Sequence, residues 1–136
     1  MTRARPDPER GSLTAFVVVV ATALVMVAGM AYDGGQILAA HAAARADAAK
    51  AARSGAQELD LTTLRSTGEA ILDLARAQSA AMAYLQRAGA IGTVTVDGPS
   101  VTVTVTATQP LLILPGADRT IVVTQTATAT DQPLRP

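Results

Sequence analysis

The sequence predicts a membrane-anchored α+β chain, in which a long N-terminal transmembrane and stalk helix precedes one helix packed on a three-stranded antiparallel sheet. Three features predict it: an uncharged apolar run near the N-terminus, an Ala-rich segment after it, and Val/Thr alternation toward the C-terminus. They divide the 136 residues into an N-terminal segment (1–11), a transmembrane helix (12–32), a stalk helix with a linker (33–65), a small α+β domain (66–130) and a tail (131–136).

The apolar run has the length of a membrane span. Residues 11–32 include no charged side chain, and about 20 helical residues rise about 30 Å, the thickness of the hydrocarbon layer. A cleaved signal peptide has a shorter apolar region, of about 7–15 residues, and a small-x-small exit. A buried soluble helix is the other alternative, but so small a chain offers little to bury it. The run therefore favours a permanent anchor.

Charges on either side of the run predict its orientation. Arg3, Arg5 and Arg10 precede it, and Asp33 is the first charge after it. By the positive-inside rule the N-terminus is cytoplasmic and the C-terminal domain is extracytoplasmic. We therefore expect a single-pass protein of the cell membrane.

Residues 33–54 are typical of a stalk. Gly34 and Gly35 either kink the helix or allow it to continue, because glycine costs about 1 kcal/mol in a helix interior. An unbroken helix over residues 12–54 would be about 65 Å long. Its Ala-rich part lacks a large apolar stripe, so we expect it to pack only against a close-approaching helix. A domain of about 65 residues is marginal, so the stalk or a partner subunit should complete its core.

A second helix is predicted to begin near Ser66, where Ser66 and Glu69 have the spacing of a capping box. Gly89 is the expected residue after its C-terminus. Helical spacing predicts a buried face formed by Ile71, Leu74, Gln78, Ala81, Met82 and Leu85.

Beyond Gly89 the period changes from helical to two. Thr and Val alternate over 93–96 and 101–106 around the turn-forming residues 97–100, which predicts a hairpin. A third strand is predicted over residues 121–130. Valines should face the helix and threonines the solvent.

The composition argues against catalysis. Cysteine is absent and His41 is the only histidine, so thiolate chemistry and an ordinary zinc site are excluded. Glu69 and Asp73 are one turn apart but are expected to be surface charges. Zero formal net charge gives no reason to expect nucleic-acid binding. We expect no enzyme activity, cofactor or metal.

Two features are candidates for partner contacts. Asp33 follows the membrane span directly, and four aliphatic residues stand between Pro110 and Pro115 where a loop is expected. This loop either folds back over the open end of the helix–sheet sandwich or docks on a neighbouring subunit or the membrane surface. The candidate contact residues are Asp33, Leu111, Leu112, Ile113 and Leu114.

The N-terminal half resembles a known family. The residues Glu-Arg-Gly-Ser-Leu-Thr-Ala-Phe at 9–16, the span, Tyr-Asp-Gly-Gly at 32–35 and the Ala/Arg helix are similar to TadE/TadG-like proteins of tight-adherence (Flp) pilus systems, of the actinobacterial type. The similarity covers most of the chain. It implies a pilin-like or pseudopilin-like component that assembles or anchors a surface pilus or related secretion apparatus. The implied partners are the lipid bilayer, other pilus or secretion membrane proteins, and further copies bound through the N-terminal helix.

The resemblance also implies a processing site. A prepilin peptidase cuts such proteins after a Gly that precedes the apolar run, and Gly11–Ser12 is the matching bond. Processed members have Glu at the fifth position after the cut, whereas this chain has Phe16, so a cut and an uncut chain both stay open. The alternative function is a single-span accessory or regulatory subunit that never enters a filament.

Overall fold

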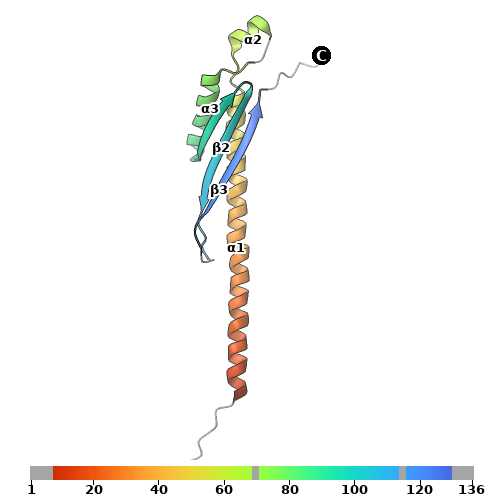
Figure 1. The fold of residues 1–136 in the computed structure, drawn as a ribbon, viewed down its shortest axis with the longest axis vertical. Coiled ribbons are helices and arrows are strands. Elements are labelled where there is room, and N and C mark those ends of the chain that lie inside the picture. Colours follow the sequence, from red (N-terminus) through yellow and green to blue (C-terminus); the bar gives the residue numbers. More distant parts are fainter. Residues whose placement is uncertain (1–7, 69–70, 114–115, 130–136) are drawn as a thin grey trace, which may run out of the picture.

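The structure, a computed structural model, describes residues 8–68, 71–113 and 116–129. It has the predicted fold class: a long N-terminal helix, then a short helix, and a helix packed on a three-stranded antiparallel sheet (Figure 1). The elements in chain order are α1 (Pro8–Ala56), α2 (Leu61–Thr67), α3 (Leu74–Ala88), β1 (Ile91–Asp97), β2 (Ser100–Gln109) and β3 (Arg119–Thr128). We call the packed unit of the C-terminal part of α1, α3 and the sheet the head.

Helix α1 continues without interruption through Gly34 and Gly35. Its 49 residues correspond to a length of about 73 Å. A Cβ placed on either glycine would meet nothing within 4 Å, so packing against the described residues does not require glycine at either position. Of the two alternatives for the segment after Asp33, the structure has the continuous helix.

The three strands pair in the order β1-β2-β3, and both pairings are antiparallel. A tight turn joins β1 to β2, and its Gly98 has a φ of 54°, a left-handed conformation that glycine adopts without steric cost. Val101, Val103 and Val105 are buried, as the alternation predicts. Their threonine neighbours lie on the opposite face, where Thr102 pairs with Thr126 and Thr104 with Thr124, each through hydroxyl groups 2.9 Å apart.

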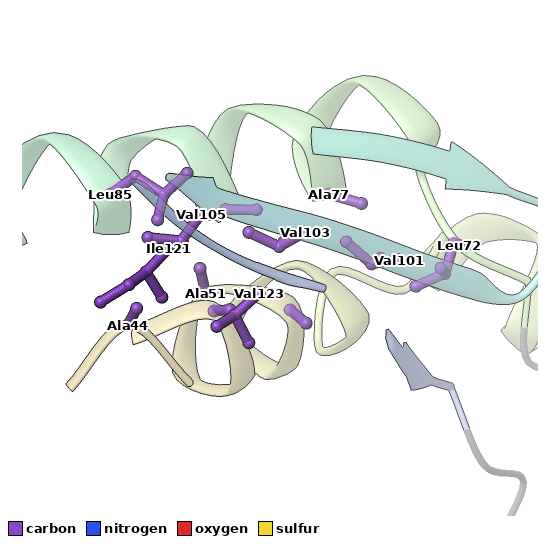
Figure 2. Close-up of a cluster of buried hydrophobic side chains, with 13 residues drawn as sticks. Ala44, Ala51, Leu72, Ala77, Leu85, Val101, Val103, Val105, Ile121 and Val123 are labelled. Carbon is purple, nitrogen blue, oxygen red and sulfur yellow. The ribbon is translucent and has the colours of Figure 1, made fainter. Parts of the chain in front are cut away.

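Helices α1 and α3 cover the valine face together. Helix α1 contacts β2, β3 and α3, while α3 contacts chiefly α1 and β1. Figure 2 shows Ala44 and Ala51 of α1 beside the inward side chains of the sheet. Small alanine side chains let the helix backbone lie close to the sheet, so the expectation that the stalk packs only against another helix is wrong. The head therefore starts within α1, ahead of the boundary predicted at residue 66.

The second long helix begins at Leu74, so the prediction of a start near Ser66 is wrong. Ser66 belongs to the end of α2, and Gly68, with a φ of 76°, terminates that helix. Asp73 is the N-cap of α3 and accepts a hydrogen bond from the Arg76 N–H at 3.1 Å. The predicted capping partner Glu69 lies outside the described residues.

The buried face of α3 also differs from the predicted one. Its buried residues are Ala77, Ala81 and Leu85, whereas Leu74 and Met82 are exposed. The prediction followed the largest apolar side chains. In the structure α3 presents two alanines because its backbone lies so near α1 that a Cβ on Gly55 would be 2.7 Å from the Ala77 carbonyl oxygen.

Candidate interaction site

The N-terminal half of α1 is an apolar rod that no other described element covers. Large aliphatic and aromatic side chains from Leu13 to Tyr32 are exposed around the helix. Among the residues that the structure describes, α1 alone is long and apolar enough to cross a membrane, by length and composition. The hydroxyl of Thr22 donates to the Val18 carbonyl at 2.8 Å, so this polar group is satisfied within the helix itself.

Asp33 marks the end of this apolar surface and is a buried residue, with 2% of its surface exposed. Its Oδ1 accepts a hydrogen bond from the Leu112 N–H and its Oδ2 accepts one from the Ile113 N–H, both at 3.1 Å. The carboxylate thus holds two consecutive backbone amides of the β2–β3 loop. A charged acceptor makes such bonds stronger than those between neutral groups.

In the β2–β3 loop, two aliphatic side chains are exposed, whereas the backbone amides of the same residues contact α1. Leu112 is 67% exposed and Ile113 49% exposed, although their amides bond to buried Asp33. Leu111 is half-buried and lies near Gly116, where an added Cβ would be 3.2 Å from its Cδ1. The described part of the loop therefore presents Leu112 and Ile113 to the surroundings, and we call this pair with Asp33 the loop latch.

The structure brings together candidates that the sequence named separately. Asp33 and the aliphatic loop are 79 and 80 residues apart along the chain, and nothing in the local pattern around Asp33 indicates this pairing. Leu114 lies outside the described residues. Gly11 and Ser12, the candidate processing site, lie near the N-terminal end of α1, about 30 Å of helix before Asp33.

Among the other polar residues that the structure describes, the candidates His41 and Asp73 lie apart from one another, on α1 and at the start of α3. No group of three or more His, Asp or Glu side chains suited to a metal ion occurs among residues 8–68, 71–113 and 116–129. His41 is exposed on α1, and Asp73 caps α3 while its Oδ2 lies 3.7 Å from Arg76 Nε. An open hollow beside Ala44 and Val105 has one acidic side chain, Asp47, in its lining. The surfaces that stand out are therefore apolar ones.

No protein-family model, curated protein or solved structure matches this chain.

Proposed function

We propose that this chain is a single-pass membrane protein whose α1 crosses the bilayer and holds the head outside the cytoplasm. The apolar rod from Leu13 to Tyr32 supports it, because about 20 residues exposed on every side suit lipid better than water. The Arg residues ahead of the rod support a cytoplasmic N-terminus. A cleaved signal sequence would share the apolar run, so the two are separated by measuring the mass of the mature chain.

Within the membrane, we propose a non-catalytic, pilin-like role in assembling or anchoring a Flp-type surface pilus or a related secretion apparatus. The observation that supports it best is the continuity of α1, which is both the apolar rod and, through Ala44, Ala48 and Ala51, part of the head's core. One helix of this kind transmits the position of the head to the membrane without a flexible joint. The same apolar rod can pack against other helices once the protein leaves the lipid.

The alternative is a single-span accessory or regulatory subunit that stays in the membrane. Phe16 favours this alternative, because processed pilin-like proteins of the resembled type have Glu at that position. Phe16 is exposed on the apolar rod and suits lipid contact. An uncut chain would keep its cytoplasmic arginines and so resist extraction from the bilayer.

Intact mass of the protein from its native membrane, together with its presence in sheared surface fibres, tests these proposals. Loss of residues 1–11 and recovery in the fibres support the filament component. A full-length chain found in membranes alone supports the accessory subunit. Recovery in the soluble fraction without residues 1–32 contradicts the membrane anchor itself.

A matched pair of variants checks the anchor directly. Val19→Arg places a charge in the middle of the apolar rod, where insertion costs about 2.5–3.5 kcal/mol. Val122→Arg places the same charge on the exposed outer face of the sheet. We expect the first variant to be lost from washed membranes and the second to remain. Equal retention of both would contradict insertion of α1.

A further inference from the structure

The loop latch lies at the level where α1 would leave the membrane. The Leu112 amide is 3.1 Å from an oxygen of Asp33, so the loop lies within about one helical turn of that residue. Asp33 is the first charged residue after the apolar run. Its neighbour Tyr32 is half-exposed, and tyrosine is enriched at membrane–water interfaces. Figure 1 shows the β2–β3 loop at the end of the head nearest the N-terminal half of α1, with α2 at the opposite end.

The exposed side chains of the loop continue the apolar surface of the rod. Leu112 and Ile113 lie beside α1 at the level of Asp33, just beyond Tyr32, which is the last residue of the apolar rod. Burying their aliphatic surface is favourable, and the described part of the chain leaves them uncovered. Their backbone amides, which lipid could not satisfy, are already bonded to the Asp33 carboxylate. The loop can therefore present aliphatic side chains to lipid without exposing those two amide groups.

We propose that the β2–β3 loop is a second membrane contact, in which Leu112 and Ile113 enter the headgroup–acyl boundary of the leaflet that α1 leaves at Asp33. This inference rests on the proposed membrane anchor. Continuity with the apolar rod identifies the bilayer as the occupant. Residues 110–117 include no charged side chain, so the contact is with acyl chains and does not depend on anionic lipids.

The consequence is a head whose tilt is restricted. A single helix allows the head to tilt and to rotate with α1 about the membrane normal. A second contact beside the helix restricts the tilt, because tipping the head away would draw Leu112 and Ile113 out of the interface. Asp33 determines the height of the loop, since its two hydrogen bonds join the loop to α1 at one helical position.

Single tryptophans test this contact in the full-length chain, which has no Trp of its own. Leu112→Trp and Ile113→Trp report on the loop, Leu24→Trp on the rod, and Leu61→Trp on the half-exposed start of α2 at the far end of the head. Each variant is placed in phosphatidylcholine nanodiscs whose acyl chains have bromine at a shallow or a deep position. Bromine quenches tryptophan only at contact distance.

We expect shallow bromine to quench Leu112→Trp and Ile113→Trp, deep bromine to quench Leu24→Trp, and neither to quench Leu61→Trp. Quenching of the loop tryptophans no stronger than that of Leu61→Trp overturns the membrane contact, while Leu24→Trp still reports the anchor. An unquenched Leu24→Trp contradicts the anchor as well. A blue-shifted but unquenched loop tryptophan shows that protein covers the loop, which also overturns the inference.

A further variant tests the role of Asp33. Asp33→Asn in the Leu112→Trp background removes the charge and one of the two acceptor oxygens, so we expect shallow quenching to fall. Asp47→Asn, on the half-exposed surface of the same helix, is the matched control and should leave the quenching unchanged. Far-UV circular dichroism of both variants reports whether the head is folded. If Asp33→Asn is folded and quenched as strongly as the control, Asp33 does not set the height of the loop.

Discussion

Gly55 lies where α1 packs tightly against α3 and β2, so a methyl group there should destabilise the head. A Cβ at this position would be 2.7 Å from the Ala77 carbonyl oxygen and 3.0 Å from Cγ1 of Val101. The carbonyl belongs to the backbone of α3 and cannot rotate away as a side chain could. In Gly55→Ala the two helices must therefore move apart.

The expected magnitude follows from two opposed contributions. Overpacking of this kind costs about 1–3 kcal/mol, and replacing Gly by Ala in a helix gains up to about 1 kcal/mol. Gly55→Ala should thus lower the free energy of unfolding by about 0–3 kcal/mol. Gly34→Ala makes the same change in the same helix, but its Cβ meets nothing within 4 Å, so it should be neutral or stabilising by up to about 1 kcal/mol. If helix propensity contributes equally at both sites, its contribution cancels in the comparison. The free energies of unfolding of the two variants should then differ by about 1–3 kcal/mol.

Urea unfolding of the full-length chain in detergent, followed by far-UV circular dichroism, measures this difference from the transition midpoints. The slope of the transition should be the same for both variants, because neither changes the surface exposed on unfolding. If Gly55→Ala is as stable as Gly34→Ala, the packing of α1 against α3 is looser than the structure shows and the reasoning is wrong.

Three further predictions concern α3 and α2. Leu85→Ala should cost about 2–5 kcal/mol because Leu85 is 2% exposed, whereas Met82→Ala, at 36% exposure on the same helix, should cost less than about 1 kcal/mol in the same urea assay. Gly89→Ala should destabilise by about 1 kcal/mol, because φ is 66° at this C-cap, and Gly89→Asn should recover part of the loss; equal midpoints would contradict a left-handed cap. The Thr63 hydroxyl and the backbone N–H groups of residues 62 and 63 lower the pKa of Asp60 below its ordinary value of 3.8. A lowered pKa means that Asp60 stabilises α2 above pH 3.8 and loses this effect as the pH falls through the folded pKa. Carboxyl NMR titration of Asp60 should therefore show a midpoint below 3.8, and Thr63→Val should raise that midpoint.

Local patterns were sufficient where one face of an element differs sharply from the other. The Val/Thr alternation predicted the strands and the direction in which each side chain points, and the structure confirms it for Val101, Val103 and Val105. The alternation is informative because a strand places successive side chains on opposite faces. Of the candidate site, the sequence named both Asp33 and the aliphatic loop but not their contact.

The sequence patterns did not predict the core where it is formed by alanine side chains. Ala44, Ala48 and Ala51 are buried in a helix that also has exposed alanines, so composition could not tell one side from the other. The start of α3 was misplaced because Ser66 and Glu69 have the spacing of a capping box, while Asp73 was expected to be a surface charge. Asp73 is the true cap because residues 58–60 and 71–73 pair across the base of α2, with the Asp73 N–H bonded to the Glu58 carbonyl at 2.9 Å.

By itself, therefore, the sequence determined two kinds of element: an apolar helix, from the length of its uncharged run, and three strands, from their alternation. The tertiary structure alone decided which alanines form the core and where Asp33 finds its partners. The physical reason is that periodicity records burial of large side chains within one element. Close backbone approach, as at Gly55, and hydrogen bonds between residues 33 and 112 depend on how distant elements meet.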